Sequence, residues 1–246
     1  MGLLSIILNR GSIIEIASCI ISAVIVVFLV MPVHEYAHGF AAEKLGDPTP
    51  RWQGRMTLNP LKHIDYIGAV MIFLIGFGWA KPVQCDSRYF KKPKRDMAIT
   101  ALAGPLSNII CAFISSLIRS ALLFTVIKTG HSLDYYLFLE GQNPDSYWLV
   151  VLFIIVMIFE YVIIINLSLA VFNLIPIPPL DGSRIISAFL PPRIYYNLMR
   201  YERYFFMILI VLMASDVLAL PLSYAIGSVD SALFWLASLP FRLIMG

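Results

Sequence analysis

Residues 13–38 read IIEIASCIISAVIVVFLVMPVHEYAH, an apolar run of membrane-spanning length that ends in a His-x-x-x-His pattern with a glutamate after the first histidine. On a helix, side chains four residues apart lie on one face, so His34 and His38 can both direct an imidazole at one Zn²⁺. Glu35 then lies beside them as a carboxylate base. The stretch therefore predicts a membrane helix that carries a metal site with a base next to it.

The composition places this helix in an integral membrane protein. Hydrophobic residues make up 59% of the 246 residues, charged residues 13%, and the mean hydropathy is +0.82. The net charge of +3 is small and scattered, which argues against a nucleic-acid partner. The cysteines are few and widely separated, so they predict neither a disulfide framework nor a CxxC zinc site: Cys19, Cys85 and Cys111.

The apolar segments predict an all-α integral membrane protein, a multi-span helical bundle with about five crossings in a single membrane-embedded domain over residues 1–246. Residues 12–33 suffice to cross a core of about 30 Å, and we interpret them as a retained span because no signal-cleavage site follows. Pro32 predicts a kink just before His34. The later apolar segments lie near 97–127, 148–175, 204–222 and 231–245.

Two shorter segments lie between the first two spans. After a predicted break at Gly46-Asp47-Pro48, residues Arg51 to Leu58 predict a short hairpin at the membrane surface. Ile67 to Trp79 is apolar, but as a helix it would reach only about 20 Å, too short to cross. We therefore predict that it is re-entrant or dips into the membrane surface.

A catalytic zinc usually takes three protein ligands, and the histidine motif supplies two. Glu160 is one candidate for the third, because an ionisable group inside a span is often functional. However, about 20 Å of helix separate it from the end of its span at Asn173, which leaves the alternative of a protonated or hydrogen-bonded glutamate between helices. We interpret His63 and His131 as interface or loop residues.

Asp181 is the better candidate for the third ligand. It follows a run of prolines and precedes Gly182 and a helix-like Ser183 to Leu190, so it is expected at a non-helical break or a helix N-terminus, where carboxylates are favoured. A simple helix cap is the alternative interpretation.

Topology agrees with Asp181. The basic region from Lys44 to Arg95 predicts a cytoplasmic location, which places the histidines near the cytoplasmic face and the N-terminus outside. Asp181 can meet them only after an even number of crossings, and the spans near 97–127 and 148–175 supply two. The basic patch from Arg184 to Arg203 then also falls inside.

Five motifs in order carry a family resemblance, and they cover roughly residues 30 to 190. Together they resemble the site-2 protease family of intramembrane zinc metalloproteases, in its compact prokaryotic branch. The motifs are HEYAH, Gly54 to Leu61 (GRMTLNPL), Phe77 to Val83 (FGWAKPV), Ala103 to Asn108 (AGPLSN) and Asn173 to Gly182 (NLIPIPPLDG).

The resemblance implies a core of three transmembrane helices around one Zn²⁺, with His34, His38 and Asp181 as ligands and Glu35 as the catalytic residue. It implies a multi-pass cell-membrane protein, of prokaryotic type, that cleaves the transmembrane helix of a single-span substrate near the cytoplasmic side. The chain departs from the family pattern at Tyr66, where relatives often have proline, and it has no PDZ-like insert between the motifs.

Four further residues are candidates for substrate binding. Asn108 and Asn173 can offer hydrogen bonds to an extended substrate or to the zinc region, or can join helices as polar contacts. Gly54 and Arg55 belong to the predicted hairpin, whose strand edge could hold an unwound substrate. A homo-oligomer is left open, as are two alternative functions: a non-enzymatic metal-binding membrane protein, and a membrane zinc hydrolase of a lipid-like substrate.

Overall fold

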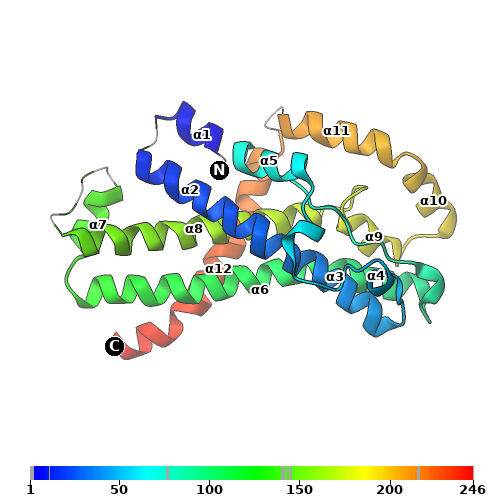
Figure 1. Ribbon diagram of the computed structural model, residues 1–246, viewed down its shortest axis with the longest axis horizontal. Helices are drawn as coiled ribbons and strands as arrows, with labels where there is room; N and C mark the ends of the chain where they lie inside the picture. Colours follow the sequence, from blue (N-terminus) through cyan, green and yellow to red (C-terminus); the bar gives the residue numbers. More distant parts are fainter. Residues whose placement is uncertain are drawn as a thin grey trace.

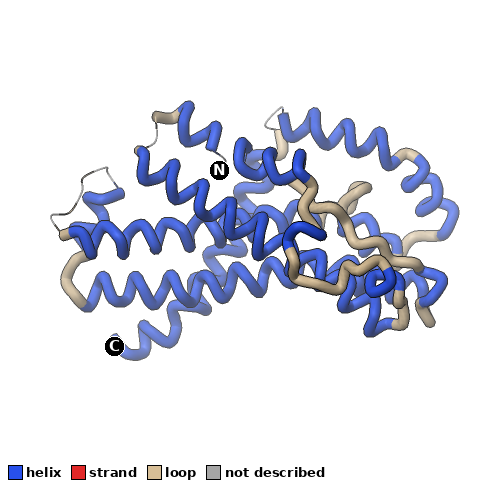
Figure 2. The backbone as a smooth tube through the Cα atoms, viewed as in Figure 1, coloured by secondary structure: helices blue, strands red, loops and turns tan. Residues whose placement is uncertain are grey.

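The computed structural model is a bundle of helices whose longest members lie side by side (Figures 1 and 2). It describes residues 3–10, 12–75, 78–139, 142, 144, 146–214 and 217–245. The elements are α1 Leu3–Leu8, α2 Ile13–Ile25, η1 Val26–Val30, α3 Met31–Leu45, α4 Thr49–Trp52, η2 Pro60–Lys62, α5 Tyr66–Ile75, η3 Ser87–Tyr89, α6 Pro93–Lys128, α7 Ser132–Leu139, α8 Tyr147–Asn173, α9 Asp181–Ser187, α10 Pro192–Arg200, α11 Glu202–Ala214 and α12 Ala219–Met245.

Four helical segments of the described residues are long and apolar enough to cross a membrane: Ile13–Leu45, Pro93–Lys128, Tyr147–Asn173 and Leu220–Ile244. The first three correspond to the first three predicted spans, and the third ends at Asn173, two residues before the predicted boundary. The predicted boundaries near 204–222 and 231–245 are wrong, because α12 runs as one helix from Ala219 to Met245. Polar residues in its first half, including Asp230, lowered the hydropathy there and hid its continuity.

The first span is longer than predicted and does not end at residue 33. It begins with a capping box in which Ser12 and Glu15 bond each other's backbone N–H groups, and it continues to Leu45. Gly46, at φ 110°, ends it in the left-handed conformation that favours glycine. The π-helical turn η1 lies just before Pro32, which removes one backbone donor from the helix.

Small residues every four positions let α6 pack closely on its neighbours. All are buried, and they form a stripe that winds slowly around the helix: Thr100, Gly104, Asn108, Ala112, Ser116 and Ser120. Ala112 packs against Ile163 and Leu167 of α8, which runs beside α6 in Figure 1. This close packing fixes the level of α6 at which Thr100 to Asn108 meet α3.

The segment after the first span turns back without crossing, as predicted. The amide of Lys81 donates to the His63 carbonyl at 2.7 Å, and Ile64 pairs with Ala80 in an antiparallel bridge on either side of α5. A Cβ on Gly78 would lie 2.0 Å from the Gly68 carbonyl oxygen, so the returning chain passes against α5 at a point where only glycine fits. Ile72 of α5 packs in the apolar core with residues of α2 and η1.

The predicted hairpin at Arg51 to Leu58 is wrong. Residues Thr49–Trp52 form the short helix α4, and the following residues form turns rather than strands. Pro48 and Pro50 restrict the backbone to a φ that suits a first helical turn. The described residues contain one isolated bridge and no strand, so no strand edge exists here to bind an unwound substrate.

Candidate metal centre

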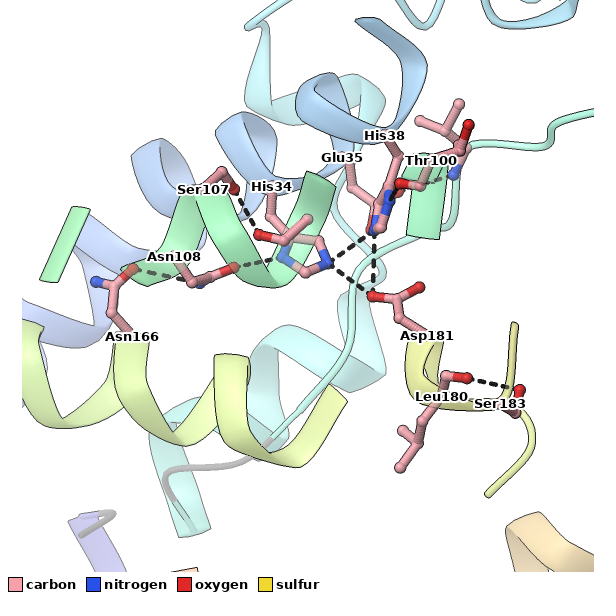
Figure 3. A network of polar contacts seen from close by, with 12 residues as sticks. His34, Glu35, His38, Thr100, Ser107, Asn108, Asn166, Leu180, Asp181 and Ser183 are labelled. Atoms are coloured by element: carbon pink, nitrogen blue, oxygen red, sulfur yellow. Dashed lines mark hydrogen bonds and ion pairs between the residues drawn. The ribbon is translucent and has the colours of Figure 1, made fainter. Parts of the chain in front are cut away.

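Two histidines of α3 and an aspartate from far along the chain meet in the second half of the first span (Figure 3). The Asp181 Oδ2 atom lies 3.5 Å from His34 Nε2 and 3.3 Å from His38 Nε2. The two Nε2 atoms are 3.1 Å apart. One ligand atom from each residue lies within 4.8 Å of the others, a group that can hold a metal ion.

The histidines owe their positions to α3 and to α6. One helical turn brings them to the same face, where both are buried. The Nδ1–H of His38 donates to the Thr100 carbonyl at 2.8 Å, and the Nδ1–H of His34 donates to the Asn108 side-chain oxygen. Because each Nδ1 carries the proton, each Nε2 lone pair is left free toward the centre of the cluster.

Gly104 supplies the space that the imidazoles occupy. A Cβ at this position would lie 2.3 Å from His38 Nε2 and 2.7 Å from His34 Cε1. Any larger residue would push both ring edges out of the cluster. The glycine of the AGPLSN motif is therefore required by the packing of α6 on the two imidazoles.

Asp181 reaches the histidines from the first turn of α9. Gly182 makes this possible, since a Cβ there would lie 2.3 Å from the Leu174 carbonyl oxygen at the end of α8. Leu180 holds the cap position, so the Asp181 side chain is not the helix cap that the alternative interpretation required. Burial works to raise the pKa of the Asp181 carboxyl, but His38 and His34, when they are also protonated at Nε2, hold that pKa well below its usual range.

Glu35 lies beside the cluster and is held separately. Its Oε2 accepts a hydrogen bond from the Val83 amide at 2.8 Å, and the side chain is buried. Val83 belongs to the segment that returns from α5, so this segment orients the carboxylate. Within the described part of the chain, the second carboxylate oxygen, Oε1, accepts no hydrogen bond.

The donor set fits zinc. Two imidazole nitrogens and one carboxylate oxygen are ligands that Zn²⁺ accepts, and three protein ligands are the number typical of catalytic sites. Each histidine is oriented by a hydrogen bond from its second nitrogen, as metal-binding histidines usually are. The two imidazoles and the carboxylate can therefore bind a metal cation.

In a comparison with sequence models of protein families, residues 22–214 match the family "Peptidase family M50". The chain belongs to peptidase family M50. A Bacillus subtilis relative of this M50 chain, named "Putative zinc metalloprotease YwhC", is 36% identical over 194 residues, which are 79% of this chain and 80% of the relative. "Putative zinc metalloprotease Rip2" of Mycolicibacterium smegmatis is 25% identical over 191 residues, which are 75% of this chain and 63% of that protein. No solved structure matches the chain.

Membership in M50 makes this chain a zinc metalloprotease and confirms the predicted resemblance to site-2 proteases. The non-enzymatic alternative therefore falls away. Together with its long apolar helices, the family also makes the chain a multi-pass membrane protein whose surroundings are a lipid bilayer.

The other candidate ligands lie elsewhere. Glu160 pairs with Arg119, which also lies 3.6 Å from Asp230 of α12, so the glutamate joins helices rather than the metal cluster. His63 is buried, and its Nε2 donates to the Thr57 carbonyl, whereas His131 bonds Asp134. Cys19, Cys85 and Cys111 form no disulfide bond.

The four candidate substrate-binding residues have different surroundings. Asn108 is fully buried between His34 and Asn166, and its side-chain amide donates to the Asn166 side-chain oxygen at 3.2 Å. It therefore faces the candidate metal ligands rather than a substrate. Asn173 is partly exposed at the end of α8. Gly54 and Arg55 lie in the turn after α4, where Arg55 donates to the Lys62 carbonyl.

Sequence reasoning did not identify three contacts that shape the site: the Thr100 carbonyl, the Val83 amide and the Asn166 side chain. The first two are backbone groups, which carry no residue-type signal. Asn166, a polar residue within an apolar helix, was the one detectable signal.

Substitutions at Asn108 should show whether Asn108 orients His34 or is only needed for the protein to fold. Asn108→Leu removes the acceptor for His34 Nδ1–H, and we expect zinc affinity to fall by about 10- to 100-fold. Asn108→Asp keeps an acceptor and should retain most of the affinity. Zinc binding measured by competition with a chelator, at equal helicity by circular dichroism, tests this. Equal affinity in both variants would contradict the positioning role.

Proposed function

We propose that this chain is an intramembrane endopeptidase that cleaves a transmembrane segment of single-span membrane proteins. The observation that carries the proposal is the cluster of His34, His38 and Asp181 beside Glu35, in the second half of a helical segment of membrane-spanning length. We propose that the three residues bind one Zn²⁺, in a single domain embedded in the membrane.

The expected location of the site is the cytoplasmic side. The end of α3, α4, the start of α6, α9 and α10 lie at one end of the bundle, and α7 lies at the other (Figure 1). The first end carries most of the basic residues, from Lys44 to Arg95 and from Arg184 to Arg203. The positive-inside rule supports placing that end in the cytoplasm and the N-terminus outside.

Glu35 is the proposed general base. Bound zinc lowers the pKa of water and polarises a peptide carbonyl. Glu35, fixed through one oxygen by the Val83 amide, uses its other oxygen to take a proton from the attacking water. It then returns that proton to the leaving amine. His34, His38 and Asp181 keep their positions through this cycle because their supports come from α6 and α8.

Asn173 is the proposed polar contact to substrate. It is partly exposed as the last residue of α8, eight positions before Asp181, so a peptide near the cluster would pass close to it. Asn108 has the supporting role described above. The substrate roles first considered for Gly54 and Arg55 depended on a strand edge, and none is proposed.

The test is cleavage by the purified zinc-loaded protein in lipid vesicles. A panel of single-span proteins would be offered beside soluble peptides and phospholipids, and mass spectrometry would locate each cut. We expect cuts within transmembrane segments, in the half near the cytoplasmic side. Products from lipids, with none from any single-span protein, would favour the lipid-hydrolase alternative and overturn the proposal.

A further inference from the structure

A groove with a volume of about 710 Å³ lies between the beginning of α6 and the helix α9. We propose that it binds one anionic phospholipid, whose headgroup lies at Lys92 and Lys94 and whose acyl chains lie along α6. The proposal concerns lipid binding and does not depend on the proposed proteolysis. The residues of the groove on which the proposal rests are Lys92, Lys94, Ala98, Ile99, Leu102 and Phe189.

The groove is separate from the group of His34, His38 and Asp181. Ala98 and Leu102 lie two positions from Thr100 and Gly104, which is about 200° around the helix. They therefore occupy the face of α6 opposite to the one that packs on His38. A ligand in the groove would not contact the cluster directly.

The charge at one end of the groove is positive and largely uncompensated. Arg95 pairs with Asp96 at 2.7 Å, but within the described part of the chain neither Lys92 nor Lys94 forms an ion pair with a carboxylate. The Lys94 ammonium donates to the Leu190 carbonyl at 2.8 Å, which leaves its other protons free. The N-terminus of the long helix α6 adds a partial positive charge.

The rest of the groove is apolar and exposed. Ile99 and Leu102 are each 43% exposed and Phe189 is 83% exposed. From Lys92 to Leu102 the helix rises about 15 Å, so the cationic end and the apolar floor follow one another along the axis. Apolar surface beside lysines at the cytoplasmic end of a membrane helix fits an anionic lipid.

Other ligands would complement either the charge or the apolar surface of the groove, but not both. Free phosphate would neutralise the lysines but leave the apolar floor uncovered, and a neutral lipid would leave the lysines unpaired. An anionic phospholipid satisfies both. The phospholipid would also contact α6 and α9 together. Because α9 carries Asp181, lipid binding would hold α9 in place.

The experiment is native mass spectrometry of the zinc-loaded full-length protein in detergent, titrated with phosphatidylglycerol or phosphatidylcholine. We expect one phosphatidylglycerol per chain to bind more tightly than phosphatidylcholine. Lys92→Gln with Lys94→Gln should weaken phosphatidylglycerol binding about 25-fold, or about fivefold for each charge. Ala98→Phe, which fills the apolar part, should weaken both lipids.

The matched control removes two lysines from outside the groove, Lys44→Gln with Lys62→Gln. It should change phosphatidylglycerol binding less than about twofold. Zinc content and helicity report whether each variant folds. Three results would overturn the proposal: equal binding of the two lipids, equal losses in the two double variants, or displacement of the lipid by inorganic phosphate or by a single-span substrate.

Discussion

Glu35→Gln should abolish proteolysis while leaving zinc in place. Glutamine keeps the size of the side chain and can still accept the hydrogen bond from the Val83 amide, but it cannot take a proton from water at neutral pH. Loss of a general base costs typically about 10²- to 10⁴-fold in rate. Because Glu35 is outside the ligand group, the zinc content should stay at the wild-type value.

Cleavage of a single-span substrate and zinc content should be measured on the same preparations. Glu43→Gln is the matched control, since it removes a carboxylate from the same helix. Glu43 forms an ion pair with Arg51, whose side chain is largely exposed. It should change the cleavage rate little. A Glu35→Gln protein that cleaves at the wild-type rate would refute the role of Glu35 as base.

Gly104→Ala should release zinc although it adds only one methyl group. Alanine in place of glycine normally stabilises a helix, by about 1 kcal/mol. Here the added Cβ would lie 2.3 Å from His38 Nε2, so the imidazoles must move and the expected effect has the opposite sign. We expect zinc affinity to fall by about 100-fold or more, because two of the three ligands are displaced together.

Gly227→Ala is the matched control for this substitution. Gly227 lies within α12, and a Cβ there would meet no atom within 4 Å. This variant should bind zinc as the wild type does and should unfold at the same or a slightly higher temperature. If Gly104→Ala also retained zinc, the arrangement of α6 against the histidines would be wrong.

The local features of the site could be predicted from the sequence because they follow from helical periodicity. The spacing of His34 and His38 requires a shared face on any helix. Asp181 could be inferred from the broken helix around it and from the even number of crossings. The short apolar segment before Trp79 was correctly predicted not to cross, because its length alone excludes a span.

The features that the sequence did not reveal depend on contacts between distant segments. Asn108 was a candidate for a hydrogen bond to the zinc region, but no pattern near His34 indicates that Asn108 accepts its Nδ1–H in particular, or that Gly104 makes room for the rings. The predicted hairpin was wrong because Pro48 and Pro50 favour a helical turn, which α4 forms. The continuity of α12 was missed because its first half is polar enough to resemble a loop.

The most direct test of the account is the zinc content of the wild-type protein, Asp181→Ala and Glu160→Gln, measured with cleavage of a single-span substrate. We predict one zinc per chain and full cleavage in the wild type, and neither in Asp181→Ala. Glu160→Gln should keep both, because Glu160 pairs with Arg119 away from the cluster. An Asp181→Ala protein that keeps zinc and activity, beside a Glu160→Gln protein that loses them, would contradict the account.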